Sequence, residues 1–196
     1  MGVGRDTRLS ADDWAAEALV VLGEKGLGGI AVEPIAARLG ATKGSFYWHF
    51  ANRDALVEAA LARWEQVTEG IITAMDEEPD PQQRLRRLFR QVVTGATSNG
   101  VEIGLLGNAD DPRVAPVLRR VTQRRLRYVA DTFAAIGFDE RAARQRAVLA
   151  YTAYLGHVQL ASTAPDELAD PMADPDYFEL VVNGLIHPVR HAPHDR

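Results

Sequence analysis

The apolar positions of this chain recur with the spacing of helix faces, and residues typical of helix ends separate them. The first apolar stripe runs from Trp14 to Leu22 and is followed by Gly26, a residue that commonly ends a helix. Ser10 precedes the stripe and Asp13 stands three positions later, which is the spacing of a capping box. The pattern predicts a helix over residues 10–25.

Two short helices and one long helix follow. Apolar and small residues predict a helix over 33–39, Gly40 ends it, and Thr42 is a suitable N-cap for a helix reaching residue 49. Asn52 caps the next helix, whose apolar stripe continues from Leu56 to Met75. Two prolines within residues 79–81 interrupt the pattern and end this helix.

Five more helices are predicted in the rest of the chain, and no segment alternates apolar and polar residues as a half-buried strand does. They begin near residues 81, 101, 112, 139 and 175. The predicted fold class is therefore all-α, with about nine helices. We expect a three-helix N-terminal domain with a helix-turn-helix over residues 1–53 and a larger helical domain over residues 54–196.

The segment from Ile35 to Phe50 carries the clearest functional signal. Ala36 is small enough for a close helix approach, and Gly40 allows the positive φ of a sharp turn. In this arrangement Ile35, Leu39, Phe46 and Phe50 face a small core, whereas Lys43, Ser45, Tyr47, Trp48 and His49 point outward. An ordinary helical hairpin is the alternative, but so many consecutive aromatic residues cannot all be buried on one short helix. The pattern favours a helix-turn-helix that enters the major groove.

Residues 47–50 read Tyr-Trp-His-Phe, and the basic Arg53 follows shortly after. This run, within residues 10–60, resembles the signature of the TetR family of transcriptional regulators. The resemblance implies a sequence-specific DNA-binding regulator rather than an enzyme. It further implies a repressor that a small-molecule ligand releases from its operator.

The resemblance also implies a role for individual residues. Tyr47 and His49 correspond to phosphate contacts, and Arg53 stands where the family usually has a lysine, beside a helix N-terminus that favours phosphate. Thr42 is a further candidate for phosphate binding. The positions implied to reach base edges are Lys43, Gly44, Ser45 and Trp48.

Charge and composition narrow this picture. A net charge of −5 excludes a surface that binds nucleic acid over its whole extent, so the DNA contact must be a local patch. Residues 1–54 hold six basic and seven acidic residues, from which we expect modest non-specific affinity. The chain has no cysteine, which excludes disulfides and thiolate zinc sites. The N-terminal residues lack an apolar signal core, and we expect a cytoplasmic protein without a membrane span, metal or cofactor.

Residues 147–165 contain no charged side chain, although they are too polar for a membrane span. A helix of this kind is buried on several sides, against its own core and against a partner. The resembled family pairs its last two helices with those of a second subunit in a four-helix bundle. We therefore expect a homodimer. Its two DNA-binding domains, one from each subunit, imply a palindromic operator in double-stranded DNA.

The larger domain is expected to bind a small, largely apolar effector. Apolar residues with a few polar tips are the candidates for its walls, although each is equally compatible with a plain core position. They are Trp64, Phe89, Arg125, Phe133, Tyr151, Tyr154 and His157. Arg125 lies on an apolar stripe, where pairing with an acid or extension to solvent is favoured over an anionic ligand.

Two alternatives from other classes stay open at this point. An enzyme would need a pair of carboxylates, a metal cluster or a Ser-His-Asp arrangement, and none can be assembled from the sequence. His187 and His191 have a metal-binding spacing, but Pro188 interrupts it, and a solvated tail is favoured. A protein-interaction module that kept the fold without operator binding is the other alternative, because the N-terminal domain is nearly neutral.

Overall fold

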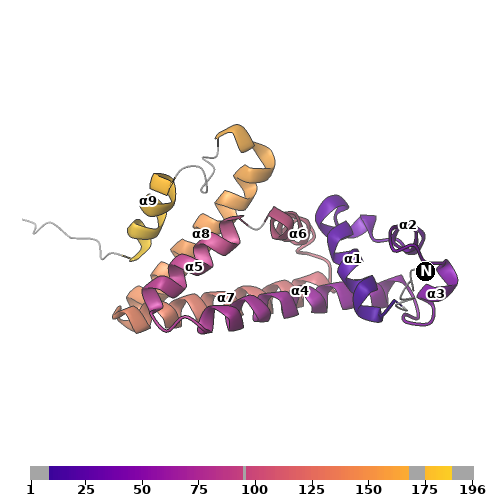
Figure 1. Ribbon diagram of the computed structural model, residues 1–196, viewed down its shortest axis with the longest axis horizontal. Helices are drawn as coiled ribbons and strands as arrows, with labels where there is room; N and C mark the ends of the chain where they lie inside the picture. Colours follow the sequence, from indigo (N-terminus) through magenta and orange to yellow (C-terminus); the bar gives the residue numbers. More distant parts are fainter. Residues whose placement is uncertain (1–8, 95, 168–174, 187–196) are drawn as a thin grey trace, which may run out of the picture. The chain divides into compact units, whose positions relative to one another are not determined.

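The computed structural model describes residues 9–94, 96–167 and 175–186. Within these ranges it has nine α-helices, two short 3₁₀ helices and no strand, which confirms the all-α prediction (Figure 1). The α-helices are α1 (Ala11–Lys25), α2 (Val32–Arg38), α3 (Lys43–Phe46), α4 (Arg53–Asp76), α5 (Pro81–Thr94), α6 (Ala96–Leu106), α7 (Val114–Ile136), α8 (Glu140–Thr163) and α9 (Pro175–Ile186). The 3₁₀ helices are η1 (Leu27–Gly29) and η2 (Pro165–Glu167). His187 and His191 lie outside the described residues.

The chain forms two compact units. Unit one consists of the described residues up to Gly70 together with residues 97–121, and unit two consists of residues 71–96 together with the described residues from 122 onward. Helices α4 and α7 each contribute their first part to unit one and their last part to unit two. These compact units are not the predicted DNA-binding domain (residues 1–53) and larger domain (residues 54–196), and the boundary between those domains stays a prediction.

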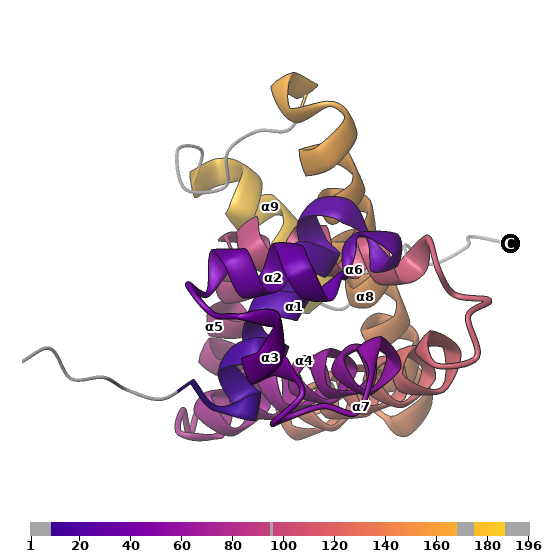
Figure 2. The same cartoon turned by 90° about the vertical axis from the view of Figure 1, so that its right-hand side faces the viewer.

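Unit one is built on one hydrophobic core. Trp14 and Leu22 of α1, Ile35 of α2, Phe46 of α3 and Leu56 of α4 are completely buried in it. Figure 2 shows α1, α2 and α3 gathered around the start of α4. Residues of α6 and of the first half of α7 complete the core, and they are Val101, Leu105, Val114 and Val121.

Side-chain caps start two of these helices where the sequence predicts them. The hydroxyl of Ser10 accepts the amide of Asp13, and the Asp13 carboxylate accepts the amide of Ser10 at 2.7 Å, which confirms the capping box. The amide oxygen of Asn52 accepts the backbone N–H of Ala55 at 2.9 Å. These caps satisfy helix-end groups that would otherwise lack partners.

Helix α6 approaches the last turn of α1 without an intervening side chain. A Cβ atom placed on Gly100 would lie 2.8 Å from the carbonyl oxygen of Gly23, and one on Gly104 would lie 2.8 Å from that of Leu22. Both distances are shorter than real Cβ contacts. The two glycines of α6 are therefore required for this crossing, which we call the glycine crossing.

Unit two contains a second core, in which Leu85 of α5, Phe133 of α7 and Val182 of α9 are completely buried. Arginine side chains add polar contacts around it. Arg86 of α5 binds Glu179 of α9 at 2.6 Å, and Arg146 of α8 donates to the carbonyl oxygen of Leu185. Helix α9 is thereby held by both apolar and charged contacts.

Several helix ends differ from the prediction for local reasons. Helix α7 begins at Val114 rather than at residue 112, because the Asp111 carboxylate accepts the backbone N–H of Arg113 and holds a turn before the helix. Helix α6 extends back to Ala96 instead of beginning near residue 101. None of the described helices combines the length and apolarity needed to cross a bilayer.

Candidate nucleic-acid interface

The turn between α2 and α3 has a defined hydrogen-bond pattern. Gly40 has a φ of +62°, a conformation that glycine adopts without steric cost. The backbone N–H of Ala41 donates to the carbonyl of Ala36 at 2.8 Å, and that of Gly40 donates to Ala37 at 3.2 Å. This pair of bonds is a Schellman motif, and it turns the chain sharply at the end of α2.

Helix α3 is very short and depends on its cap. The Thr42 hydroxyl accepts the backbone N–H of Ser45 at 3.1 Å, and the Ser45 hydroxyl donates to the Thr42 carbonyl at 2.9 Å. Only residues 43–46 are α-helical, and hydrogen-bonded turns continue the segment, with the Phe50 N–H donating to the carbonyl of Phe46 at 3.0 Å. The helix predicted to reach residue 49 is therefore shorter than expected.

Three aromatic rings hold this segment on unit one. Phe46 is completely buried, with its ring centroid 5.4 Å from that of Trp14 in an edge contact and 5.5 Å from that of Phe50 in a stacked contact. Such pairs add to the free energy gained by burying the rings. The aromatic stack of Trp14, Phe46 and Phe50 thus fixes the underside of residues 43–50, which we call the recognition segment.

The outer side of the same segment presents large side chains to solvent. Tyr47 is 56% exposed and Trp48 is 79% exposed, which confirms the outward orientation predicted for both. Lys43 and Gly44 are exposed as well, whereas Ser45 and His49 are half-buried. A surface with a freely exposed tryptophan beside a tyrosine is unusual unless it meets a partner.

Lys43 is already paired within the chain. Its ammonium nitrogen lies 2.8 Å from a carboxylate oxygen of Glu33 in the first turn of α2. This hydrogen bond raises the pKa of Lys43 and lowers that of Glu33. Glu33 was not among the predicted site residues, although an acid ten positions before a lysine, across a helix-turn-helix, is a signal for such a pair.

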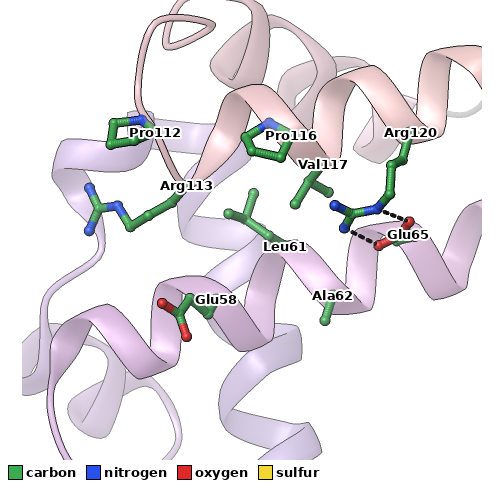
Figure 3. A pocket seen from close by; sticks show the side chains of 9 residues that line it. All are labelled: Glu58, Leu61, Ala62, Glu65, Pro112, Arg113, Pro116, Val117 and Arg120. Atoms are coloured by element: carbon green, nitrogen blue, oxygen red, sulfur yellow. Dashed lines mark hydrogen bonds and ion pairs between the residues drawn. The ribbon is translucent and has the colours of Figure 1, made fainter.

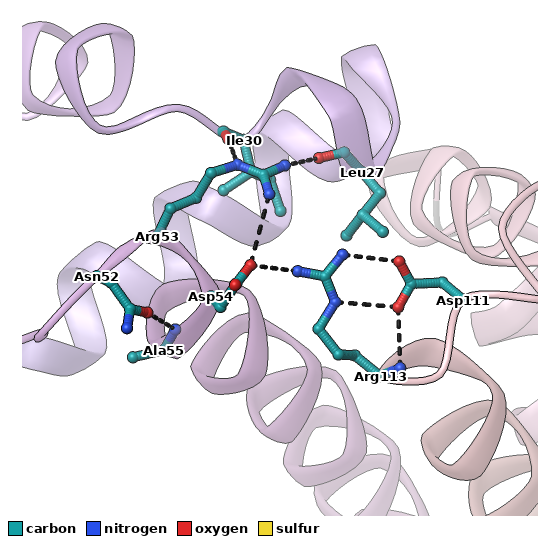
Figure 4. A network of polar contacts seen from close by, with 8 residues as sticks. All are labelled: Leu27, Ile30, Asn52, Arg53, Asp54, Ala55, Asp111 and Arg113. Atoms are coloured by element: carbon teal, nitrogen blue, oxygen red, sulfur yellow. Dashed lines mark hydrogen bonds and ion pairs between the residues drawn. The ribbon is translucent and has the colours of Figure 1, made fainter.

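Arg53 is also engaged inside unit one (Figure 4). Its Nε donates to the carbonyl oxygen of Ile30 at 2.6 Å and its terminal nitrogen donates to that of Leu27 at 2.9 Å. These carbonyls belong to the connection between α1 and α2. The guanidinium therefore ties the start of α4 to this connection. A phosphate bound by Arg53 would share the guanidinium with these two hydrogen bonds.

A third cation near the turn serves packing. Arg38, in the last turn of α2, donates to both carboxylate oxygens of Glu24 at 2.7 and 3.1 Å and also binds Glu17. Both acids belong to α1, so this ion pair clamps α2 on α1. Such a forked pair adds geometric definition as well as energy.

The residues predicted to line an effector pocket occupy different parts of the fold. Trp64 belongs to the core of unit one, whereas Phe89 and Phe133 belong to the core of unit two. Between α7 and α8, the Tyr151 hydroxyl lies 3.2 Å from that of Thr122, and Arg125 lies 6.0 Å from the ring centroid of Tyr154. His157 is buried. Their role in ligand binding stays a prediction.

A groove of about 370 Å³ lies between the first halves of α4 and α7 in unit one (Figure 3). Leu61 and Val117 line it, and Arg120 bridges its edge by donating to both carboxylate oxygens of Glu65 at 2.8 and 2.9 Å. None of the residues predicted for the effector pocket lines this groove.

Comparisons with known proteins agree with this geometry. Residues 16–60 match the family model of the bacterial regulatory proteins, tetR family. No curated protein sequence shows significant similarity to the chain.

Solved structures share the fold over almost the whole length. A transcriptional regulator from Rhodococcus sp. Rha1 has a TM-score of 0.73 at 22% identity, covering 91% of this chain and 94% of that protein. A putative transcriptional regulator from Saccharomonospora viridis in complex with choline has a TM-score of 0.72 at 17% identity, covering 90% and 94%. The multidrug binding protein EbrR complexed with malachite green has a TM-score of 0.62 at 23% identity, covering 91% and 98%.

The matched residues 16–60 include the capped turn, Phe46 and Phe50 of the aromatic stack, and the exposed Tyr47 and Trp48. Because the members of this family are regulatory proteins and not enzymes, the match also bears out the prediction of a non-enzymatic protein. The helix-turn-helix within residues 16–60 is thus that of the tetR family of bacterial regulatory proteins, and the fold of the described residues is that of solved transcriptional regulators.

Proposed function

We propose that the protein is a repressor that binds a palindromic operator as a homodimer and leaves it when a small molecule binds. The observation that carries the DNA-binding part is the exposure of Tyr47 and Trp48 on a segment whose other side is fixed by the aromatic stack. A rigid segment with exposed aromatic side chains suits a groove of DNA better than it suits water.

Within this proposal the predicted DNA-contacting residues have separate roles. Tyr47, His49 and Thr42 bind phosphates, and Arg53 adds positive charge near the N-terminus of α4. Lys43, Gly44, Ser45 and Trp48 face the base edges, where an ammonium suits guanine and an indole ring suits the methyl group of thymine. Lys43 must leave Glu33 to reach a base, which an exposed ion pair permits at low cost.

The exposed apolar side chains of α8 and α9 support the homodimer. Val148, Leu149 and Leu160 of α8 and Leu180 of α9 are all more than 40% exposed. Helix α8 also exposes the uncharged residues Thr152, Ala153 and Gly156 to solvent. An uncharged helix face of this kind is suited to pack against its own copy, because small residues allow close approach and apolar residues leave water.

Release by a ligand is supported by the similar structures and by the helices that the two units share. The Saccharomonospora viridis protein was solved with choline and EbrR with malachite green. In this chain α4 and α7 belong to both units, so a ligand bound in unit two could change the arrangement of unit one. The ligand must prefer the conformation that does not bind DNA, since equal affinity for both states would release nothing.

Fluorescence anisotropy with the promoter region next to the protein's own gene tests the function. The wild type should bind this DNA more tightly than random DNA, and Trp48→Ala should lower operator affinity by at least tenfold. Leu106→Ala, at another exposed apolar residue, is the matched control and should bind as the wild type does. Equal binding of the wild type to both DNAs would contradict a sequence-specific regulator and favour a protein-interaction module.

A further inference from the structure

Four charged residues form a continuous network within unit one. Arg53 and Asp54 begin α4, whereas Asp111 and Arg113 lie immediately before α7 (Figure 4). Through the carbonyls of Leu27 and Ile30 the network also includes the connection that leads into α2. It thus joins three segments that are far apart in the sequence.

Arg113 is the centre of this network. Its Nε and a terminal nitrogen donate to the two carboxylate oxygens of Asp111 at 3.0 and 2.7 Å, which fixes the plane of the guanidinium. Its other terminal nitrogen donates to the carboxylate of Asp54. Asp54 in turn lies 3.7 Å from the guanidinium of Arg53. The charges therefore alternate in sign along the network, from Arg53 through Asp54 and Arg113 to Asp111.

The apolar contacts beneath the network provide attraction without direction. Val114 and Val121 of α7 lie in the same core as Leu56 and Leu61 of α4. Aliphatic contacts of this kind tolerate small sliding and rotation, whereas a forked ion pair fixes both distance and angle. Arg113 is placed to define how the start of α4 lies on α7.

The electrostatics add a second effect. Asp54 is in the first turn of α4 and its side chain is 63% exposed. A carboxylate at this position repels a phosphate that approaches the N-terminus of α4, unless a cation neutralises it. Arg113 supplies that cation while its own position is held by Asp111.

We propose that Arg113 is a positioning residue for DNA binding, which holds Asp54 and, through Arg53, the entrance of α2 in the orientation that presents the recognition segment. This inference rests on the proposed function. Arg113 acts on the contacts that join the start of α4 to residues 111–113 and to the connection before α2, which we call the α4 junction, and it does not itself contact DNA. The expected consequence of its loss is a less defined recognition segment in a protein that is still folded.

Distance measurements between spin labels test the positioning step without DNA. The chain has no cysteine, so Ala37→Cys in α2 and Arg119→Cys in α7 give two specific labelling sites, both exposed and both in unit one. Labelled protein diluted with unlabelled protein reports the distance within one chain. Arg113→Ala and Asp54→Ala should each broaden this distance distribution, and the double variant should broaden it no further. Arg113→Lys, which keeps the charge but loses the fork, should give an intermediate width.

Operator binding tests the functional step with the same variants. Arg113→Ala should lower operator affinity by roughly tenfold, as expected for a lost charged hydrogen bond. In the Asp54→Ala background the same substitution should have little further effect, because both act through one contact. The slope of affinity against salt should stay as in the wild type, since no phosphate contact is lost.

Two outcomes would overturn the inference. A direct phosphate contact would lower the salt slope by about one and would persist in the Asp54→Ala background, with an unchanged distance distribution. A purely structural role would lower the unfolding midpoint while the folded variant kept the wild-type distances and operator affinity. If the wild type binds no DNA, the proposed function fails, and the distance distributions alone decide whether Arg113 orients the α4 junction.

Discussion

The ammonium of Lys43 and the carboxylate of Glu33 form an ion pair between the first residue of α3 and the first turn of α2. Both side chains are more than half exposed. A base contact by Lys43 therefore competes with Glu33, whose charge also repels approaching phosphates. The ion pair therefore favours binding to DNA sequences that offer Lys43 a contact strong enough to replace the one with Glu33.

Glu33→Gln should raise affinity for random DNA more than affinity for the operator, so the ratio between the two should fall. The salt dependence should become steeper by about one counterion, because Lys43 is then available to phosphates. Binding curves at several salt concentrations measure both effects. Glu77→Gln removes an equal charge from unit two and is the control. Identical results for the two variants would exclude a specific effect of Glu33.

Arg53→Ala and Lys43→Ala should differ in their effect on folding. Arg53 donates to the carbonyls of Ile30 and Leu27, two buried residues, so its loss should lower the free energy of unfolding by about 1–3 kcal/mol. Lys43→Ala removes only an exposed ion pair and should leave the free energy of unfolding nearly unchanged. Urea denaturation of both variants measures this difference. Equal stability would contradict the structural role of Arg53.

The same two variants should also differ in DNA binding. Arg53→Ala should weaken binding to operator and random DNA alike, whereas Lys43→Ala should relax the preference at one base pair, by about 1–3 kcal/mol. Competition assays with single-base operator variants detect this preference. If Lys43→Ala lowered the affinity for all operator variants equally, Lys43 would not contact a base specifically.

Stability at alkaline pH should depend on Tyr128. Burial, together with the nearby Asp76 carboxylate, raises the pKa of the Tyr128 hydroxyl from 10.0 to about 12. The folded state thus favours the protonated phenol. The resulting stabilisation is fully present below pH 10 and is lost as the pH rises through about 12.

Between pH 10 and 12 the free energy of unfolding of the wild type should fall by about 1–2 kcal/mol more than that of Tyr128→Phe. Urea denaturation at intervals of half a pH unit measures this difference. Parallel curves for the two proteins would show that the hydroxyl of Tyr128 does not contribute.

The glycine crossing gives a test of packing with a matched control. Gly100→Ala would place a methyl group 2.8 Å from the carbonyl oxygen of Gly23 and should destabilise the protein by about 1–3 kcal/mol. Gly70→Ala, in α4, meets no atom within 4 Å and should stabilise it by about 0.5–1 kcal/mol. Thermal unfolding of both variants would reveal the opposite signs. A stabilising effect of Gly100→Ala would mean that α6 does not pack closely against α1 at this position.

The proposed homodimer is tested by Leu149→Glu. Leu149 is 54% exposed within the chain, so a charge there should prevent association without disturbing the subunit's own core. Leu155, also on the uncharged stretch, is half-buried and is a less selective site. Leu106→Glu, at a leucine of α6 that is 42% exposed, is the control. Light scattering should show a dimer for wild type and control and a monomer for Leu149→Glu; a monomeric wild type would contradict the proposal.

The helices could be predicted because their signals are local. Ser10 with Asp13, Gly40 and Asn52 act on backbone groups within a few residues, so their roles can be read from spacing alone. The exposure of Trp48 followed from the same pattern, since a short helix has only one buried side. The partners of charged side chains could not be predicted in this way.

Those partners depend on how distant segments meet. Arg53 folds back on carbonyls more than twenty positions earlier, and Arg113 reaches Asp54 from the start of α7. The start of α6 was placed too late because Gly100 weakens a helical pattern, and its reason becomes visible only beside Gly23 of α1. Tertiary contact, not local preference, decides each of these positions.

The aromatic stack beneath the recognition segment has a thermodynamic consequence. Four helical residues are far too few to keep a helical conformation alone. The rings of Trp14, Phe46 and Phe50 hold this segment in one conformation as part of the folded core, so its entropy is lost during folding and not on meeting DNA. A substitution that loosens the stack transfers this entropy loss to the binding step, and the protein then distinguishes sequences less well before it unfolds.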